Sequence, residues 1–428
     1  MLGKDMATCA SSAVSNTSRR EDSVPDGLPY GRQTIGASDV SAVARATISP
    51  YLTQGPRVRD FEKALADYVG VRNAVTFSSG TAALHAAAVA AGVSNGNRFI
   101  TTPLSFVASA NCALYCGIRP RFVDVDPWTA NLDPIKATEL ANMFVDPVIL
   151  TVSLAGLPAV LPQTTGIVIE DACHALGAIR DGQPVGKEAD ITVFSFHPVK
   201  VITTGEGGAA VTDNDEFAEA MREFRHHGIR RSEDPEDPLK GPWHYDIHEI
   251  GHNYRLTDIQ SALGIEQLKR LDEFISRRQA IASRYRHLLY DVDNIELPPA
   301  PWSDRTTHAY HLFVVRFPEG PDRRRTVYEY LRDQGIGTQL HYIPIPVLTV
   351  YQKMGYSMAG LPNAQKYYEE ALSIPIFPTM TKENIERVAR ELKVAMTLPV
   401  DSWKRSMAKQ SSSLVVPAHS GPLSSVLS

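Results

Sequence analysis

Short apolar runs alternate along the chain with longer segments of helical character. The runs with the length and composition of buried strands lie at 74–77, 99–102, 122–125, 166–169 and 191–196. An alanine-rich segment that begins at Thr81 and another that ends at Gly117 have the composition of helices. Strands separated by helices predict a mainly parallel sheet covered on both faces, and therefore an α/β fold.

The chain is long enough for more than one domain. Its 428 residues exceed the size at which a single hydrophobic core stops growing. A helical segment from about Thr257 to Tyr290 is followed by a proline-rich stretch at 297–302, which is typical of a domain boundary. We therefore expect a large domain over residues 27–290 and a smaller C-terminal α+β domain over 291–402.

Both ends of the chain differ from the rest in composition. Residues 1–26 and 403–428 are polar and rich in serine, without periodic apolar positions. Such segments cannot bury enough apolar surface to offset the entropy of ordering them, so we expect disordered tails. The most apolar internal stretch, 148–161, is too short and too interrupted by glycine and proline to cross a bilayer. We expect no membrane segment.

Charge and cysteine content exclude several classes of function. The chain has 43 Lys and Arg against 48 Asp and Glu, a formal net charge of -5, and so lacks the basic footprint of a nucleic-acid-binding protein. Its four cysteines form no C-x-x-C pair, which argues against a disulfide framework or a structural zinc site. These features favour a protein of the reducing cytoplasm that acts on small molecules.

Lys200 is the first candidate for chemistry. It follows a predicted strand and precedes the glycine-rich segment 203–208, in a fold whose ligands gather beyond the carboxyl ends of the strands. Burial there would lower the pKa of the amine and make it a nucleophile toward an aldehyde. Taken alone, such a lysine is more often a solvated surface charge.

Asp171 and the segment 78–84 complete the set. Asp171 ends an apolar strand and suits the protonated pyridine nitrogen of a pyridoxal ring, although a helix N-cap is the simpler interpretation of one aspartate. Residues 78–84, Ser-Ser-Gly-Thr-Ala-Ala-Leu, turn from a strand into a helix whose free N–H groups could bind a phosphate; alone they indicate only a cap. The specificity lies in the three pieces occurring together.

At this combination the sequence resembles the sugar-nucleotide aminotransferases of the DegT/DnrJ/EryC1/StrS family, from about Leu28 to about residue 400. The motifs that carry the resemblance are SSGTAAL, TTPLSFVASAN, VIEDACHALGA, FSFHPVKVITTGEGGAAVT, GHNYRLTDIQSALG and HYIP, in family order. It implies fold type I, a fold that binds pyridoxal 5'-phosphate. The parts FSFHPVK, TTGEGGA and HYIP suggest the branch that aminates a UDP-linked 4-keto-6-deoxy sugar, UDP-4-keto-6-deoxy-N-acetyl-β-L-altrosamine, for pseudaminic acid.

The resemblance also implies a role for individual residues. Lys200 would be the Schiff-base lysine, Asp171 the partner of the pyridine nitrogen, His174 the neighbour of the ring hydroxyl, and Phe106 the side chain stacked on the ring. The phosphate would be held by Gly80, Thr81, Ala82 and Ser195, with Asn253 reaching it from the neighbouring subunit of a homodimer. The sugar substrate would contact Tyr30, Leu52, Thr53, His341, Tyr342 and Pro344.

The implied reaction has two halves. L-Glutamate would leave its amino group on the cofactor, and the keto carbon of the nucleotide-linked sugar would then receive it, which predicts ping-pong kinetics. A related dehydratase branch carries histidine where this chain has Lys200, so dehydration is disfavoured. The same residues would also suit a different keto sugar, of the perosamine or aminoarabinose type, or a non-catalytic relative that binds a sugar nucleotide.

Two segments depart from the family pattern. Between Val152 and Gly166 the chain lacks a longer stretch with a helix, and this shortening would either expose sheet surface or alter dimer packing. The charged segment 230–240 either contacts a nucleotide diphosphate or is a solvated loop. His244, His248 and His252 stand four apart, as metal ligands do on a helix, but the nearby Pro242 and Gly251 argue against one helix and we expect no metal site.

Overall fold

The computed structural model describes residues 27–93, 98–230 and 243–402. The expected tails and nearly all of the charged segment 230–240 lie outside these residues. The main feature is a seven-stranded sheet whose strands, in spatial order, are β1 (Asn73–Phe77), β9 (Gly208–Thr212), β8 (Ile191–Ser195), β5 (Ile167–Asp171), β4 (Val148–Val152), β2 (Phe99–Thr101) and β3 (Arg121–Phe122). Only β9 runs antiparallel to its neighbours in this sheet, so the predicted mainly parallel α/β architecture is confirmed.

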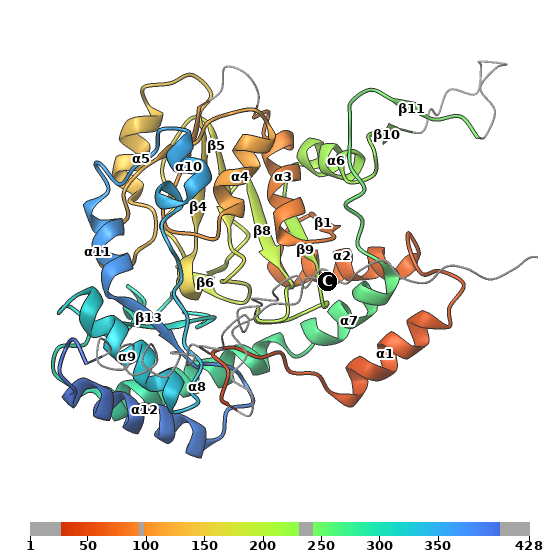
Figure 1. Ribbon diagram of the computed structural model, residues 1–428. Helices are drawn as coiled ribbons and strands as arrows, with labels where there is room; N and C mark the ends of the chain where they lie inside the picture. The colour runs from red at the N-terminus through yellow and green to blue at the C-terminus, as the bar shows by residue number, and fades with distance from the viewer. Residues whose placement is uncertain (1–26, 94–97, 231–242, 403–428) are drawn as a thin grey trace, which may run out of the picture.

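Helices cover both faces of this sheet (Figure 1). One face carries α3 (Gly80–Ala90), α4 (Ala108–Tyr115) and α6 (Asp215–Phe224), and the other carries α2 (Pro56–Val69) and α7 (Asp258–Leu268). Side chains alternate along β8, so that Val193 packs with α3 while Phe194 packs with α2 and α7.

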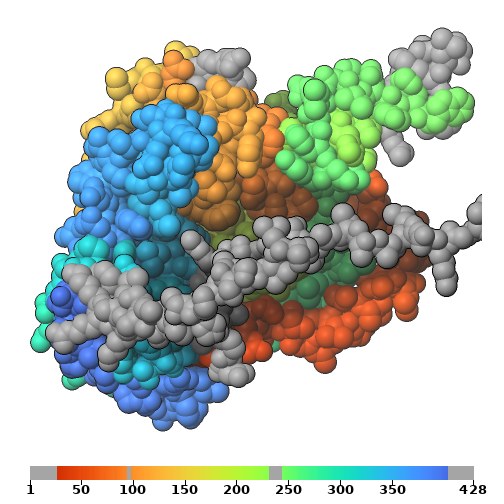
Figure 2. All heavy atoms as spheres, in the orientation of Figure 1, coloured from red at the N-terminus to blue at the C-terminus, as the bar shows by residue number. Residues whose placement is uncertain are grey.

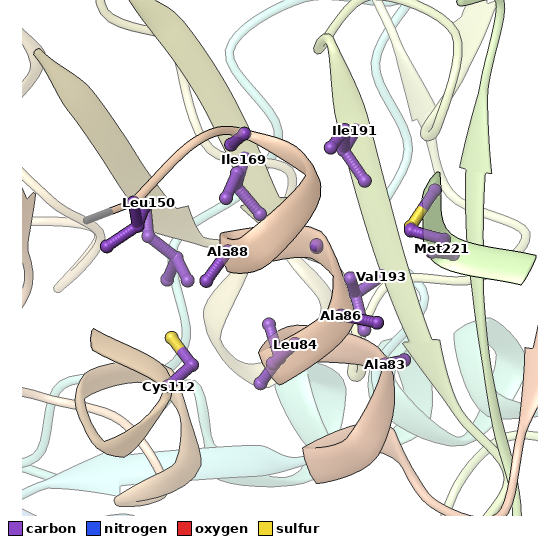
Figure 3. Close-up of a cluster of buried hydrophobic side chains, with 14 of the residues drawn as sticks. Ala83, Leu84, Ala86, Ala88, Cys112, Leu150, Ile169, Ile191, Val193 and Met221 are labelled. Atoms are coloured by element: carbon purple, nitrogen blue, oxygen red, sulfur yellow. The ribbon is translucent and has the colours of Figure 1, made fainter. Parts of the chain in front are cut away.

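Helix α3 is apolar on all sides because it is enclosed by other elements. Its alanines have no side chain beyond Cβ, which lets the helix lie close to the sheet and to α4. Figure 3 shows α3 in front of Ile169 and Val193 of the sheet, with Cys112 of α4 on one side and Met221 of α6 on the other. This packing fixes the position of the N-terminus of α3.

A second hydrophobic core lies beside the C-terminal elements. It contains the antiparallel pair β12 (Phe313–Arg316) and β13 (Ala371–Ile374), together with α8 (Leu271–Leu289), α9 (Pro321–Asp333) and α12 (Lys382–Thr397). Leu28 joins it, because its backbone N–H donates to Gly335 O at 2.9 Å and its carbonyl accepts from Gly337 N at 2.7 Å. The first described residues therefore pack against C-terminal elements. The domain boundaries given above stay a prediction.

Some element boundaries differ from the expectation. The strand expected at 122–125 ends at Phe122, and β4 and β9 were not expected as strands. The helix expected from Thr257 to Tyr290 is two helices, with a break at Lys269 and Arg270. The break has a packing reason: α7 lies against α1 (Ala37–Thr47) and α2, whereas α8 continues into the second core.

The short connection between β4 and β5 contains only a single 3-10 turn, η1 (Leu154–Gly156). Leu154, Leu157 and Ala159 are nevertheless buried, and every residue of β4 is buried. The side chain of Asn131 accepts from Leu154 N and donates to the carbonyls of Leu157 and Pro158. The shortening therefore does not expose β4. An effect on dimer packing stays a prediction.

The remaining elements are smaller. Short two-stranded ribbons are formed by β6 (Ile179–Arg180) with β7 (Gln183–Pro184) and by β10 (Ile229–Arg230) with β11 (Asp246–Ile247). The other helices are α5 (Pro134–Ala141), η2 (Ile345–Val347), α10 (Thr349–Lys353) and α11 (Pro362–Glu370). None of the helices in the described ranges combines the length and apolarity that crossing a bilayer requires.

Candidate active site

A cavity of about 670 Å³ lies beyond the carboxyl ends of β5 and β8. Its wall combines the start of α3, the loop after β8 and a segment from the second core. The predicted site residues that border it are Tyr30, Gly80, Thr81, Phe106, Asp171, His174, Ser195, Lys200, His341 and Tyr342. The structure thus brings together residues that lie up to several hundred positions apart in the chain.

Lys200 stands in the loop that joins the antiparallel strands β8 and β9. The loop is folded back on Phe196, whose carbonyl accepts from Thr203 Oγ1 at 2.9 Å and from Thr204 N at 3.0 Å. Burial lowers the pKa of the Lys200 amine below its usual 10.5, although the nearby Cys173 and Asp171 act in the opposite direction. A lowered pKa increases the neutral, nucleophilic fraction of the amine.

Asp171 is the last residue of β5, and its carboxylate is fixed in direction. Ser109 Oγ donates to Oδ2 at 2.6 Å, and the backbone N–H of Cys173 donates to Oδ1 at 3.2 Å. The adjacent Glu170 points to the other side of the sheet, where it pairs with the buried Arg180 and accepts from Ser153 Oγ. Strand alternation therefore gives one carboxylate to the cavity and the other to the protein interior.

The N-terminus of α3 meets Ser195 at very short range. A Cβ at Gly80 would lie 3.0 Å from Ser195 Cβ and 3.4 Å from Cys173 Sγ, so a side chain here would push against both neighbours. Ser79 Oγ accepts from Ala82 N at 3.1 Å and caps the helix. The N–H of Ala82 is therefore already used within the protein, and Ala82 does not border the cavity. Gly80, Thr81 and Leu84 are the residues of α3 that do.

His174 is held at both ring nitrogens. The backbone N–H of Ala155 donates to Nδ1 at 3.2 Å, and Nε2 lies 3.1 Å from the hydroxyl of Tyr342. Because Nδ1 accepts, the neutral ring carries its proton on Nε2 and donates to Tyr342. Burial, and then the nearby Lys200 and His341, hold the pKa of His174 well below 6.5, which favours this neutral form.

Phe106 borders the cavity with an exposed side chain. Its side chain is 57% exposed, and its ring centroid lies 6.2 Å from that of Tyr342. The backbone oxygen of Phe106 lies 3.3 Å from Ser109 Oγ, the hydroxyl that donates to Asp171. An aromatic face that is open to a cavity can stack on a planar ligand.

Besides Ala82, four predicted contact residues do not border the cavity. Leu52 and Thr53 are exposed and are tied by their backbone to the start of α7, and Pro344 is buried behind the wall. Asn253 is exposed, whereas the rings of its neighbours His252 and Tyr254 stack on each other with centroids 4.8 Å apart. Asn253 thus lies at the surface and does not border its own chain's cavity.

Several residues of the site were not expected from the sequence. Among them, Ser109 holds Asp171, and His311 and Glu206 border the cavity. Ser109 was foreseeable from its spacing, because it stands three residues after Phe106 and thus on the same side of a helical turn. His311 precedes β12, in a part of the chain expected to belong to the smaller domain, and nothing in its local pattern connects it to Lys200.

Metal and cysteine candidates give no site within the described residues. In these ranges no group of three or more His, Cys, Asp or Glu side chains is arranged to hold a metal ion. His252 packs in an aromatic cluster with His85, while His248 is exposed. Cys112 and Cys116 are free thiols; the former is fully buried and the latter partly buried beside the same core as α3 and α4.

Comparisons with known proteins agree with this geometry. The DegT/DnrJ/EryC1/StrS aminotransferase family model matches residues 33–393. The UDP-4-amino-4,6-dideoxy-N-acetyl-β-L-altrosamine transaminase of Campylobacter jejuni, serotype O:2, is 36% identical over 374 residues, which cover 84% of this chain and 95% of that protein.

Solved structures give the same result. The aminotransferase PseC of Helicobacter pylori, involved in the biosynthesis of pseudoaminic acid, is 30% identical with a TM-score of 0.78, covering 87% of this chain and 99% of that one. A putative sugar aminotransferase of Streptococcus pneumoniae, solved in its PLP form, is 26% identical with a TM-score of 0.78, covering 87% and 99%. These likenesses extend over nearly the whole of each relative, and the chain therefore belongs to the DegT/DnrJ/EryC1/StrS aminotransferase family.

Proposed function

We propose that this aminotransferase uses pyridoxal 5'-phosphate to move an amino group from L-glutamate to the keto carbon of a nucleotide-linked 4-keto-6-deoxy sugar. The observation that carries the proposal is that Lys200 and Asp171 border one cavity of about 670 Å³, together with the N-terminus of α3. An amine, a carboxylate and a phosphate cradle are the three groups that this cofactor requires.

The fit to the cofactor rests on the close approach of Gly80 to Ser195. The absence of a side chain at Gly80 leaves the N–H groups of Gly80 and Thr81 and the hydroxyl of Ser195 beside the cavity. The first turn of α3 contains no acidic residue that would repel an anion. The positive end of the helix dipole and these donors suit a phosphate.

When bound, pyridoxal phosphate supplies an aldehyde carbon and a conjugated ring that accepts an electron pair. Lys200 would hold that aldehyde through its neutral Nζ, and the same amine could move a proton at the substrate carbon. Asp171, held by Ser109 and the N–H of Cys173, would keep a proton at the pyridine nitrogen. Phe106, whose aromatic face is open to the cavity, would stack on one face of that ring.

The choice of sugar follows from the relatives. The altrosamine transaminase of C. jejuni and PseC of H. pylori support UDP-4-keto-6-deoxy-N-acetyl-β-L-altrosamine as the amino acceptor. Tyr30, His341 and Tyr342 border the cavity and are the proposed contacts within the same subunit. Leu52, Thr53 and Pro344 stay predicted contacts that do not border it.

A homodimer with shared sites is part of the proposal. Asn253 is exposed and outside its own cavity, which suits a residue that serves the cavity of a second copy. The neighbouring segment that carries β10 and β11 forms an arm, and Trp243 and Ile250 in it are 78% and 87% exposed. Figure 2 shows this arm, in green, standing out from the body of the molecule. Apolar side chains on a projecting arm favour contact with another copy.

A lysine replacement tests the proposal. In wild-type protein loaded with cofactor, we expect a visible absorption band that disappears when L-glutamate is added and returns when the keto sugar is added. Lys200→Ala is expected to lose about a hundredfold or more in turnover, because it removes the group that moves the proton. The exposed Lys269, paired with Glu266, provides the control Lys269→Ala, which keeps both properties.

The acceptor is tested with a panel of UDP-, dTDP- and GDP-linked keto sugars, with products identified by mass and NMR. Transfer to a UDP-linked 4-keto-6-deoxy sugar supports the proposed substrate, and transfer to a perosamine or aminoarabinose precursor instead replaces it. A Lys200→Ala protein that turned over at the wild-type rate would refute the mechanism. Binding of a sugar nucleotide without any cofactor band would identify a non-catalytic relative.

A further inference from the structure

His311 borders the cavity without a role in the proposed chemistry. Its side chain is 4% exposed, and its Nδ1 is buried with no hydrogen-bond partner among the described residues. A proton on Nδ1 would be a buried donor without an acceptor, which costs more than a bare lone pair facing the cavity wall. The proton of the neutral ring therefore belongs on Nε2.

His174, the expected neighbour of the cofactor's ring hydroxyl, has little donor capacity left. Its Nδ1 accepts from Ala155, and its one N–H is directed at the hydroxyl of Tyr342. The ring of His311 lies against it, with centroids 4.4 Å apart. The two histidines thus share one wall of the cavity, but only His311 has a nitrogen donor that no described residue uses.

The cavity also has few groups that could bind an anion. Among the described residues that border it, Lys200 is the only lysine, and there is no arginine. His341 has its Nδ1 engaged with Ser373 Oγ at 2.8 Å. An anionic oxygen on this side of the cavity must therefore be met by neutral donors.

The backbone holds His311 in place from both sides. Arg278, which is fully buried, donates through Nη1 to the carbonyls of Tyr310, His311 and Ile376 at 3.1, 3.3 and 2.9 Å. Leu312 N donates to the carbonyl of Ala155 at 3.1 Å, while Ala155 N donates to His174. The short connection after β4 therefore joins His174 to His311, and the donor position is built rather than incidental.

We propose that His311 donates an Nε2–H hydrogen bond to an anionic oxygen bound in the cavity. The inference rests on the proposed function, which supplies two such oxygens: the ring oxygen of the cofactor and a carboxylate of the amino donor. Burial keeps the pKa of His311 well below 6.5, so the ring acts as a neutral donor. No bond is formed or broken at His311, and it is a positioning residue.

The test compares three variants of the full-length protein loaded with cofactor. His311→Phe keeps the ring volume and removes the donor. His311→Gln carries an amide N–H about as far from the backbone as Nε2 and is the rescue variant. His308→Phe is the matched control, because His308 is equally buried but does not border this cavity. Wild type without a cofactor band would refute the proposed function before His311 is tested.

Two measurements distinguish the sources of the oxygen. If the cofactor oxygen is the acceptor, His311→Phe moves the pH midpoint of the visible band upward, since an oxygen that loses a donor becomes more basic. If a carboxylate of L-glutamate accepts the hydrogen bond, His311→Phe needs about 10- to 100-fold more L-glutamate to convert half of the visible band. The pH midpoint of the band then stays constant. The charged and titratable groups that share this wall are Asp171, His174, Lys200, Arg278, His341 and Tyr342.

The inference is supported if His311→Phe shows either shift, His311→Gln returns to the wild-type value, and His308→Phe shows no shift. A His311→Phe protein that binds cofactor with the wild-type midpoint and the wild-type glutamate response would overturn it. An equal shift in His308→Phe would also overturn it, because the effect would then report general loosening of the buried segment 308–311.

Discussion

Histidines that face the interior stay neutral in the folded chain. Burial lowers the pKa of His308 and of His341 from 6.5 to about 3. His308 also has its Nδ1 occupied, since it accepts from Tyr310 N at 2.8 Å. At the scale of single residues, burial therefore sets protonation states that local sequence does not indicate.

These histidines predict acid sensitivity of the cofactor-free protein. Below pH 6.5 the unfolded chain binds protons that the folded chain does not, so the stabilisation present above 6.5 is lost as pH falls toward 3. Each buried histidine contributes roughly 1.4 kcal/mol per pH unit to this loss. Denaturant unfolding measures the free energy of unfolding at each pH. Between pH 7 and pH 5 this free energy should fall less steeply with pH in His308→Phe than in wild type. Equal slopes would contradict the prediction.

The short connection between β4 and β5 shows what an element decides. At Gly156, φ is 100°, and a Cβ there would lie 2.8 Å from the carbonyl oxygen of His174 and 3.0 Å from the N of His311. This tight turn allows Ala155 to hydrogen-bond with the segments on both sides. The connection is thus a scaffold for the two histidines.

Gly156→Ala should therefore destabilise the protein by roughly 2 kcal/mol or more, because it adds both backbone strain and a backbone clash. Gly117→Ala is the matched control: its φ is 77°, and a Cβ there meets no atom within 4 Å, so only the strain of about 1 kcal/mol applies. Denaturant unfolding of both variants measures the difference. Equal losses would show that the contact with the histidine segments does not matter.

At the scale of the whole molecule, the proposed dimer predicts complementation between two defective chains. Lys200→Ala lacks the reactive amine, and Asn253→Asp brings a negative charge toward the phosphate of the neighbouring cavity. In a mixed dimer, the cavity with Lys200 from one chain and Asn253 from the other is intact. Random mixing should restore about a quarter of the wild-type activity, because half of the dimers are mixed and each has one good site.

The measurement is activity after the two purified chains are mixed under conditions that exchange subunits. Each variant alone gives the baseline, and a chain with both substitutions mixed with wild type gives the control for subunit exchange. No recovery in the mixture, with exchange demonstrated independently, would place Asn253 outside a shared site.

Local pattern was sufficient for much of the large sheet. The runs at 74–77, 99–102 and 191–196 match β1, β2 and β8 to within one residue at each end, since buried strands are marked by their own composition. The strand β9 was not predicted, because the small side chains of Gly208-Ala-Ala-Val-Thr212 resemble the glycine-rich loop before it. The break between α7 and α8 was not predicted, because it arises from the packing of the two helices against different elements.

The sequence by itself determined the family, the α/β class and the three segments that carry the amine, the carboxylate and the helix N-terminus, because each is written in contiguous residues. Only the tertiary structure decided that Asp171 faces the cavity while Glu170 faces Arg180, that Ala155 uses one nitrogen of His174, and that His311 joins the site. These depend on contacts between residues far apart in the chain, which form only when the sheet and the second core pack together.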